Sequence, residues 1–485
     1  MMNTAFRAWL AAAFSLSLVL GAAAQEKSNA TVDAIFADLA RPGSPGCALA
    51  VARGGKILYE KGYGLANLEE NVPITPRTVF DIGSTSKQFA AASILLLEKQ
   101  GQLSVNDDIR KYLPEIPDYG HKITILNLLN HTSGLRDYLA LFEMAGINVD
   151  NVTTDNDALA VIARQKSLNF APGSQWLYSN SGFFLLSIIV ERVSGKNLRE
   201  FAAANIFTPL GMAQTTYRNT HTQLVANRGL AYDPPAKDHP ERGFTLDVSY
   251  FEQTGDGAVH TSVEDLLKWD ENFYSAKIGG KEFLAEMQEP AKLNDGKALH
   301  YAKGLVVDSY RGLPAVSHGG SWGGYRAQLL RFPQQHFSVV CLCNLANAGP
   351  GDRALKVADI FLQSEFKEAK PKEKPDDDDA PPAKKQTIAV SADTLAQYAG
   401  DYASDELAAT YTLAIESGKL VLRSIRPGNG FIQKKVQTEL RPTGKEEFLA
   451  DDLEATFTFE RDTSGNVKGF SLSAERSSGI AFQKK

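Results

Sequence analysis

The sequence has little cysteine for its length. Its 485 residues include three cysteines, Cys47, Cys341 and Cys343. Three scattered cysteines are too few for the disulfide framework of a small secreted scaffold. Cys341 and Cys343 lie two apart on one face of an expected strand, a pattern that favours buried packing over metal ligation. We therefore expect structural thiols rather than a disulfide bridge, and no metal.

Positive charge is also scarce. The chain has 51 Lys and Arg against 57 Asp and Glu, a net charge of −6, and no sustained basic stripe. This balance gives no electrostatic footprint for nucleic acid or for an anionic membrane. The 43% hydrophobic and 22% charged fractions are close to soluble globular averages, which excludes a disordered, collagenous or polytopic membrane protein. The expected partner is a small-molecule or peptide substrate; the oligomeric state stays open.

Residues 1–24 have the pattern of a secretory signal peptide. Arg7 is their only charge, residues 8–20 are apolar, and three alanines precede Gln25. The apolar run is shorter than the roughly 20 residues that a spanning helix needs, so a membrane anchor is the weaker interpretation. We expect cleavage after about Ala24 and a periplasmic or secreted protein.

A charged, proline-rich segment divides the remaining chain. Residues 367–388 contain KEAKPKEKPDDDDAPPAKK and cannot bury enough apolar surface to offset their ordering entropy. They are therefore expected to be a linker between a domain at 25–366 and a second domain at 389–485.

The first of these domains is expected to be α+β. Residues 47–64 and two later runs, Gln328–Phe332 and Phe337–Cys343, have strand-like patterns. Long apolar helical patterns lie between them, at Lys87–Lys99 and Phe183–Ser194. Strands at both ends with helices between them predict an antiparallel sheet, shared by the terminal strands and flanked by helices.

The second domain shows short alternating runs instead. Residues 411–415 and 420–422 alternate around a Ser417-Gly418 turn, which is a hairpin signal. This pattern predicts a small antiparallel sandwich or barrel.

A serine and a lysine three residues apart are the first candidate for chemistry. Ser84 follows an extended stretch and opens an apolar helix, where backbone N–H groups face a nearby anion. Lys87 lies on the same helix face, so its amine can reach the serine hydroxyl and act as a general base if partly buried. The pattern is weak alone, since Ser364 and Lys367 repeat it and a simple helix cap would also explain it.

Tyr178 and Asn180 are the second candidate. They follow the Pro172-Gly173 turn on a short loop. A tyrosine there can relay a proton, and an asparagine amide can hold a substrate carbonyl.

The third candidate is His318-Gly319-Gly320-Ser321. The glycines would let a substrate backbone lie along a strand edge, and the Ser321 N–H would be a second oxyanion donor opposite that of Ser84. Residues 319–323 also fit G-x-S-x-G, but that motif needs a following helix, and a strand pattern follows here. We therefore reject a nucleophile elbow.

Taken in order, the three patterns resemble the serine β-lactamase and penicillin-binding protein family. The likeness spans about residues 30–365 and is strengthened by His131-Thr-Ser-Gly-Leu135, Ile206-Phe-Thr-Pro-Leu-Gly-Met212 and residues 257–266. Within the family, the class C-like branch is the most similar, with its D-alanyl-D-alanine carboxypeptidases, D-aminopeptidases and esterases. The resemblance implies a further all-helical subdomain, and residues 389–485 resemble the small lipocalin-like barrel that follows in some members.

The resemblance also implies roles for the candidates. Ser84 matches the nucleophile and Lys87 its activating partner. Tyr178 matches the tyrosine that exchanges protons with the nucleophile and with the deacylating water. Asn180 matches the substrate-holding amide, and Ser321 contributes a backbone N–H. No metal or organic cofactor is implied.

His318 departs from the family pattern, in which lysine usually begins a Lys-Thr-Gly element. A histidine of ordinary pKa is mostly neutral at pH 7, so a fixed cation for a β-lactam carboxylate is lost. Gly319 stands where the Lys-Thr-Gly element has threonine, so the threonine hydroxyl is absent as well. The sequence therefore favours a peptidase or esterase over an efficient β-lactamase. The alternatives are a penicillin-binding protein or class C-type β-lactamase with slow deacylation, and a non-catalytic binding member.

Overall fold

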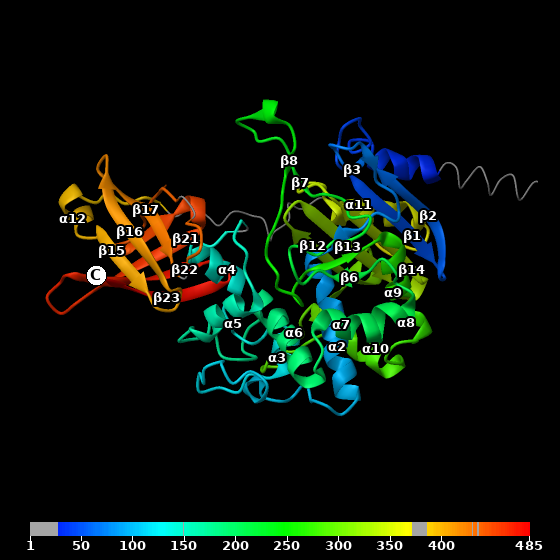
Figure 1. Cartoon of the computed structure of the whole chain (residues 1–485), viewed down its shortest axis with the longest axis horizontal. Coiled ribbons are helices and arrows are strands. Elements are labelled where there is room, and N and C mark those ends of the chain that lie inside the picture. The colour runs from blue at the N-terminus through cyan, green and yellow to red at the C-terminus, as the bar shows by residue number, and fades with distance from the viewer. Residues whose placement is uncertain (1–27, 149, 371–385, 429, 434–435) are drawn as a thin grey trace, which may run out of the picture.

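Two antiparallel sheets dominate the computed structural model of the chain. The C-terminal sheet, orange to red in Figure 1, forms one lobe, and the N-terminal sheet with its helices forms the other. The expected signal peptide at 1–24 lies outside the described residues, as does most of the expected linker at 367–388. The structure describes residues 28–148, 150–370, 386–428, 430–433 and 436–485.

A seven-stranded antiparallel sheet forms the centre of the N-terminal lobe. In spatial order its strands are β10 (Tyr301–Ala302), β11 (Leu305–Tyr310), β12 (Leu313–Trp322), β13 (Tyr325–Phe332), β14 (Phe337–Cys343), β1 (Cys47–Arg53) and β2 (Lys56–Tyr63). β1 pairs with β14 along its whole length, from Cys47 opposite Cys343 to Arg53 opposite Phe337. The expectation that strands from the two ends of this region share one sheet is confirmed.

The sheet is buried on both faces. In β1, Leu49 and Val51 face a core built with helix α11 (Pro350–Phe361), whereas Ala48 and Ala50 face a larger core built with helices from the middle of the chain. Alternate residues of a strand point to opposite faces. Because both faces are buried here, nearly every residue of β1 is apolar. Two apolar faces fix the register of the sheet.

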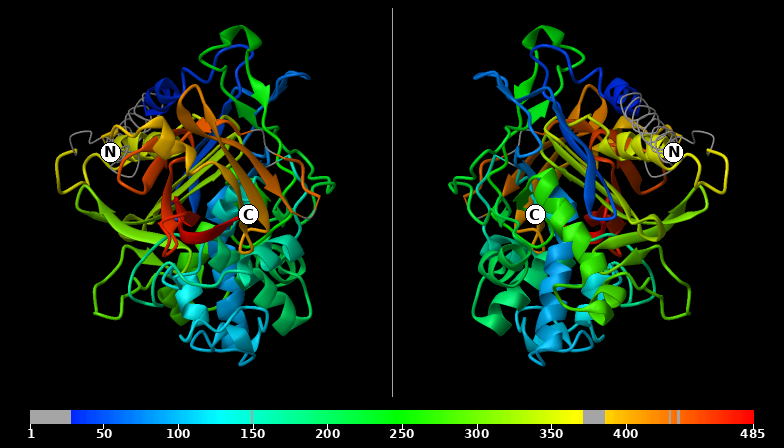
Figure 2. Two further views of the ribbon diagram at one scale, coloured as in Figure 1. Left: turned by 90° about the vertical axis from the view of Figure 1, so that its left-hand side faces the viewer. Right: turned by 90° about the vertical axis from the view of Figure 1, so that its right-hand side faces the viewer.

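The helices of the larger core lie below the sheets in both views of Figure 2. α2 (Lys87–Lys99) has the predicted bounds, and α6 (Asn180–Ser194) begins three residues before the expected Phe183. The others are α3 (Ile125–Leu129), α4 (Tyr138–Met144), α5 (Asp155–Ala163), α7 (Leu198–Ala202), α8 (Thr208–Leu210), α9 (Val263–Ser275) and α10 (Lys281–Met287). In the part of the chain that the structure describes, no helix has the length and apolar character needed to cross a bilayer.

Short strands connect these layers. β5 (Phe80–Asp81) and β6 (Thr216–Tyr217) flank β9 (Val259–Thr261) in a three-stranded sheet. β5 leads directly into a single 3-10 turn, η1 (Gly83–Ser86), and then into α2, so this small sheet positions Ser84. Two further pairs are β3 (Leu65–Asn67) with β4 (Val72–Pro73), and β7 (Tyr232–Asp233) with β8 (Thr245–Leu246).

The C-terminal lobe is a nearly closed nine-stranded antiparallel barrel, as the alternating pattern predicts. Its edge strands β18 and β19 are separated in sequence by Leu440 alone. Helix α12 (Ala392–Ala396) precedes it. In spatial order the strands are β18 (Thr438–Glu439), β17 (Lys419–Pro427), β16 (Ala409–Glu416), β15 (Gly400–Ser404), β23 (Ser477–Lys484), β22 (Val467–Ala474), β21 (Ala455–Arg461), β20 (Glu447–Ala450) and β19 (Arg441–Pro442).

Aromatic rings fill the inside of this barrel. Phe470 lies at its centre, with ring centroids of Phe482, Tyr402 and Phe457 at 4.5, 5.0 and 5.1 Å. All four side chains are buried. Packed aromatic side chains therefore fill the middle of the barrel.

Buried polar contacts join the barrel to the helical part of the first lobe. The Arg136 guanidinium donates to Glu406 Oε2 at 2.6 Å, and the two side chains are 1% and 3% exposed. Tyr411 of β16 donates its hydroxyl hydrogen to the Met144 carbonyl at the end of α4. Buried bonds of this kind make the relative position of the two lobes specific.

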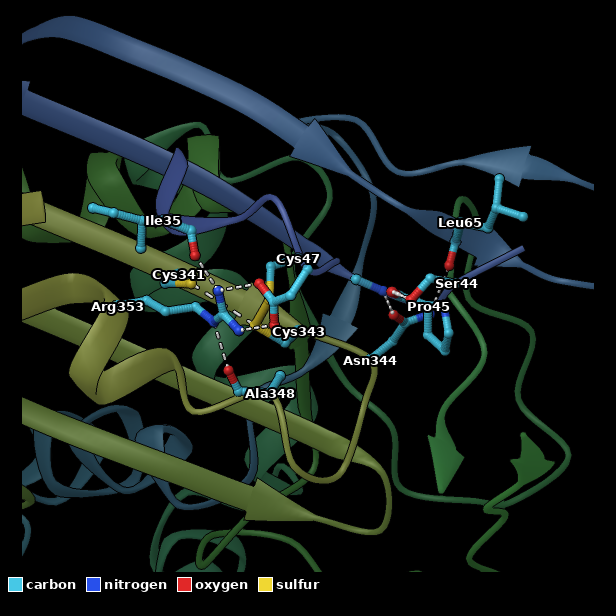
Figure 3. Close-up of a disulfide and its surroundings, with 12 residues drawn as sticks. Ile35, Ser44, Pro45, Cys47, Leu65, Cys341, Cys343, Asn344, Ala348 and Arg353 are labelled. Atoms are coloured by element: carbon cyan, nitrogen blue, oxygen red, sulfur yellow. Dashed lines mark hydrogen bonds and ion pairs between the residues drawn. A yellow bond between two sulfur atoms is a disulfide. The ribbon is translucent and has the colours of Figure 1, made fainter. Parts of the chain in front are cut away.

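The cysteines correct one expectation. Cys47 and Cys343 form a disulfide between β1 and β14, where structural thiols were expected (Figure 3). The pairing of the two strands places the cysteines opposite each other although 296 residues separate them in sequence. Cys341 keeps a free, buried thiol 3.8 Å from the Cys343 sulfur, and burial raises its pKa to about 12. These three sulfurs are the one potential metal-binding group in the described residues, and the disulfide occupies two of them.

Candidate functional site

A cavity of about 650 Å³ lies where η1, β12 and the tip of a barrel hairpin meet. It brings together seven of the eight residues singled out in the sequence: Ser84, Tyr178, Asn180, His318, Gly319, Gly320 and Ser321. The eighth, Lys87, is fully buried behind Ser84. Three patterns that span more than 230 positions of the chain therefore converge on one cleft.

Ser84 and Lys87 are in direct contact. Lys87 Nζ lies 3.1 Å from Ser84 Oγ, as their spacing on one helix face predicts. The amine also donates to Asn180 Oδ1 at 2.9 Å and to the Asp256 carbonyl at 2.7 Å. Two fixed acceptors beside the serine hydroxyl hold the amine in place and leave it no contact with bulk water.

Asp256 is buried behind this amine. Its carboxylate accepts a hydrogen bond from the Tyr138 hydroxyl at 3.0 Å. Burial raises the pKa of Asp256 to about 6, although the nearby Lys87 charge and the Tyr138 hydrogen bond oppose the shift. The carboxyl group is thus a second titratable group close to the Ser84–Lys87 pair.

Glycines allow strand β12 to lie directly against η1. A Cβ on Gly320 would come within 1.9 Å of the Ile82 carbonyl oxygen. One on Gly83, whose φ is +47°, would come within 2.7 Å of the Ser321 backbone nitrogen. The contact places the Ser321 N–H beside the turn that carries Ser84, where a second oxyanion donor was expected.

A buried aspartate positions Asn180. Asp137 caps helix α4 by accepting hydrogen bonds from the backbone of Leu139 and Ala140. Its second carboxylate oxygen accepts from the Asn180 N–H at 2.5 Å. Asn180 is therefore fixed at the start of α6, with its side-chain oxygen on the Lys87 amine.

His131 supports the loop that carries Tyr178. Its ring nitrogen Nδ1 accepts a hydrogen bond from the Ser179 N–H at 3.1 Å, and its carbonyl accepts from Leu177. The imidazole packs 4.2 Å from the Tyr178 ring, and burial lowers its pKa well below the ordinary value. His131 is therefore a neutral, buried support for this loop. Trp176, on the same loop, is 41% exposed.

His318 is neutral as well. Because the Gly319 carbonyl can only accept, the 2.6 Å contact places the hydrogen on Nδ1 and leaves Nε2 to accept from the Tyr301 hydroxyl at 3.0 Å. Burial lowers the pKa of His318 to about 4, and the Lys87 charge adds to the shift. The third motif therefore offers no fixed cation, as the replacement of lysine by histidine indicates.

The barrel contributes one residue to the cleft. Arg476 lines the cavity, and its guanidinium carbon lies 5.5 Å from the centroid of the Tyr178 ring. Burial works against the charge, but Asp137 and Glu475 outweigh it and raise the pKa of Arg476. Sequence reasoning missed Arg476 because its place depends on how the two lobes pack.

Comparisons with known proteins agree with this geometry. The model of the family described as Beta-lactamase matches residues 32–362. The chain belongs to the beta-lactamase family. It is a serine hydrolase related to β-lactamases. The family accounts for the order of the motifs around Ser84, Tyr178 and His318.

Relatives within the beta-lactamase family include peptidases. A penicillin-binding protein of Bacillus subtilis (strain 168) is 31% identical over 458 residues, covering 90% of this chain and 94% of that protein. A D-aminopeptidase of Gluconobacter oxydans (strain 621H) is 30% identical over 318 residues, 65% of this chain and 58% of the relative. The alignment with the D-aminopeptidase thus spans little more than half of that protein.

Solved structures show the same fold. The octameric penicillin-binding protein homologue from Pyrococcus abyssi superimposes with a TM-score of 0.61 at 23% identity, covering 95% of this chain and 99% of that one. The D-amino acid amidase from Ochrobactrum anthropi SV3, complexed with D-phenylalanine, gives 0.60 at 22% identity, covering 70% and 100%. The first of these likenesses extends over the barrel as well as the family region.

The residues that sequence reasoning missed share one property. Asp137, Tyr138, Asp256 and Arg476 act through contacts between distant segments rather than through a local pattern. Two of them did leave a signal. Asp137 stands just after the His131–Leu135 motif, and Asp256 just before the motif at 257–266.

Proposed function

We propose that this chain is an exported serine hydrolase that forms an acyl-enzyme on Ser84 and cleaves an amide or ester substrate, such as a D-amino-acid peptide or a short-chain ester. The observation that carries the proposal is the 3.1 Å contact between Lys87 Nζ and Ser84 Oγ inside a cleft. The D-aminopeptidase and D-amino acid amidase among the similar proteins support a D-amino-acid substrate.

In this mechanism Lys87 is the general base for Ser84. A neutral amine has two hydrogens, which Asn180 Oδ1 and the Asp256 carbonyl accept, so that its lone pair faces the serine hydroxyl. The hydroxyl proton passes to the amine as Oγ bonds to the substrate carbonyl carbon. The Ser84 and Ser321 N–H groups stabilise the oxyanion that forms.

Tyr178 completes the cycle. The Lys87 amine lies over its ring, 4.8 Å from the ring centroid. In the proposed mechanism the Tyr178 hydroxyl gives a proton to the leaving nitrogen or oxygen and is reprotonated from Lys87. Collapse of the tetrahedral intermediate breaks the bond to the leaving group and leaves the acyl group on Ser84. A water molecule then attacks the ester, and the same groups return its proton to Ser84. The side-chain amide of Asn180 holds a carbonyl group of the substrate by hydrogen bonding.

The neutral His318 disfavours efficient β-lactam hydrolysis, because it supplies no cation to the β-lactam carboxylate. The Cys47–Cys343 disulfide supports export, since such bonds persist in oxidising compartments. We also propose that the chain is divided as its composition indicates, with the hydrolase domain at 25–366 and the barrel at 389–485 joined through the linker.

Turnover of a short-chain aryl ester and a D-alanyl peptide by wild type and Ser84→Ala tests this function. We expect both activities in the wild type and loss of both in the variant, with unchanged thermal unfolding. Ser364→Ala is the matched control, since Ser364 repeats the Ser-x-x-Lys spacing on an exposed segment. Activity that survives Ser84→Ala would refute the assignment. A burst without steady turnover would favour the slow-deacylating, penicillin-binding alternative.

A further inference from the structure

The turn between β22 and β23 carries a charged side chain from the barrel to the cleft. Glu475 and Arg476 form this two-residue turn, between the paired residues Ala474 and Ser477. Glu475 adopts a φ of +43°, which reverses the chain tightly. Arg476 consequently lines the same cavity as Ser84 and Tyr178.

Backbone contacts fix the turn independently of the arginine side chain. The Arg476 carbonyl accepts hydrogen bonds from Asn169 Nδ2 at 2.8 Å and from the Asp137 N–H at 3.4 Å. Asn169 Oδ1 in return accepts from the Ser478 N–H at 3.0 Å. Asp137 is the residue that also positions Asn180. The hairpin is therefore linked by hydrogen bonds, through Asp137, to the segment that carries Asn180. A change of the Arg476 side chain leaves these backbone bonds in place.

The other basic groups near the nucleophile are engaged or neutral. The Lys87 amine is held by Ser84 Oγ, Asn180 Oδ1 and the Asp256 carbonyl, and His318 is uncharged at neutral pH. Arg218 and Arg326 also line the cavity; Arg218 donates to the His221 carbonyl, and Arg326 donates to the carbonyls of Gly323 and Tyr325. Among the described residues, Arg476 is the cavity arginine whose guanidinium contacts the Tyr178 ring.

The Arg476 guanidinium has a partner that a substrate can replace. Its Nε donates to Glu475 Oε1 at 2.9 Å, and the Glu475 side chain is 50% exposed. Water can solvate the Glu475 carboxylate when it releases the guanidinium, because half of the Glu475 side chain is exposed. A substrate carboxylate that enters the cleft can form a bidentate contact with the same guanidinium.

We propose that Arg476 is a specificity-determining residue that binds a carboxylate on the leaving group, so that the preferred substrate is a peptide with a free C-terminal carboxylate. The proposal rests on the proposed function, in which Tyr178 protonates the leaving group. The guanidinium lies 5.5 Å from the centroid of the Tyr178 ring, which places its subsite on the leaving-group side of Ser84. The barrel then completes the active site by supplying this cation from a separate lobe.

Two peptides that differ at one group test the proposal. The full-length wild type and its variants are assayed with an N-acetylated tripeptide that ends in D-alanine. The peptide is supplied either as the free acid or as the C-terminal amide. We expect the wild type to prefer the acid. Arg476→Gln is expected to lower kcat/KM for the acid about 10–100-fold, chiefly through KM, and to leave the amide unchanged. Arg476→Lys should restore part of the preference.

Control variants separate this role from a structural one. Arg423 lies on the barrel surface, 59% exposed and paired with Glu416, so Arg423→Gln should change neither substrate. Glu475→Gln removes the competing carboxylate and should lower KM for the acid alone. Equal unfolding temperatures for the wild type and Arg476→Gln would show that the hairpin stays in place.

Several outcomes would overturn the proposal. Equal hydrolysis of acid and amide by the wild type would do so, as would hydrolysis of an ester with neither peptide cleaved. An acid preference that persists in Arg476→Gln would also overturn it. Labelling of Ser84 by a fluorophosphonate separates failure of the Arg476 subsite from failure of the proposed function. Enzyme that is labelled and active but shows no preference for the acid refutes the Arg476 subsite alone. Folded enzyme that is not labelled refutes the proposed function itself.

Discussion

Lys87 Nζ lies 3.1 Å from Ser84 Oγ and 2.7 Å from the Asp256 carbonyl oxygen, so the amine is held between the nucleophile and a loop 169 residues further along the chain. The amine has no exposed surface. A helical i, i+3 spacing brings the first two groups together, and the tertiary structure supplies the third. This arrangement converts a common four-residue pattern into a site able to perform acyl transfer.

Loss of the Tyr178 hydroxyl is expected to slow catalysis without unfolding the protein. Tyr178→Phe keeps the ring contacts with His131 and Arg476 but removes the group assigned to proton transfer. General acid–base catalysis typically contributes a factor of about 10²–10⁴. We expect kcat for an aryl ester or peptide to fall by that order while the unfolding temperature is unchanged. A variant with wild-type kcat would remove Tyr178 from the mechanism.

The buried ion pair between the lobes should be costly to break. Glu406→Ala leaves the Arg136 guanidinium buried and also removes acceptors for the Lys166 and Ala481 N–H groups. Removing one partner of a buried pair typically costs about 3–5 kcal/mol. Denaturant unfolding of the variant measures this loss.

An exposed ion pair in the same loop provides the control. Asp405 is 90% exposed and lies 3.6 Å from the Lys166 amine. Asp405→Ala should cost less than about 1 kcal/mol, because exposed pairs are worth little. Equal effects of Asp405→Ala and Glu406→Ala would contradict the assignment of the buried pair as a specific link between the lobes.

Asp155 is expected to make stability depend on pH. Burial raises the pKa of Asp155 to about 7, and the charges of Glu191, Asp256 and Glu252 add to the shift. Its Oδ1 is buried and lacks a hydrogen-bond partner among the described residues. Between the unfolded pKa of about 4 and the folded pKa, the native state holds a proton that the unfolded state has released. This contribution to stability is therefore present at low pH and is lost as the pH rises to 7.

Asp155→Asn should remove that loss. We expect the variant to be more stable than the wild type at pH 8, by roughly 2–4 kcal/mol, and nearly equal to it at pH 3, where Asp155 is protonated in both the folded and the unfolded state. Denaturant unfolding of both proteins at the two pH values checks the difference. A gain of the same size at both values would mean that ionisation of Asp155 is not its cause.

The disulfide should be detectable by counting thiols. The native protein is expected to expose no reactive thiol among its three cysteines, and the unfolded, unreduced protein to react once, through Cys341. Removing the bond in a Cys47→Ala, Cys343→Ala variant should lower the free energy of unfolding by about 2–5 kcal/mol. Three reactive thiols in the unreduced, unfolded protein would contradict the bond.

The sequence predicts what depends on local patterns. The helix at Lys87–Lys99, the strand at Phe337–Cys343 and the barrel hairpin around Ser417-Gly418 all follow from apolar periodicity and turn residues. Ser84 and Lys87 meet because their spacing matches the turn of a helix. In each case the residues that determine the structure lie within one element.

What the sequence did not predict depends on distant segments. The bond between Cys47 and Cys343 requires β1 to pair with β14 in one particular register, which neither strand encodes alone. Arg476 reaches the cleft only because the buried Arg136–Glu406 pair and its neighbours place the barrel against the helices.

The most direct test of the account is to locate a covalent adduct on the protein. Wild-type protein and Ser84→Ala are exposed briefly to a fluorophosphonate, and intact mass is followed by peptide mapping. The account predicts one adduct per wild-type chain, on Ser84, and none on the variant. An adduct on another serine, or no adduct on correctly folded wild-type protein, would contradict the assignment of Ser84 as the nucleophile.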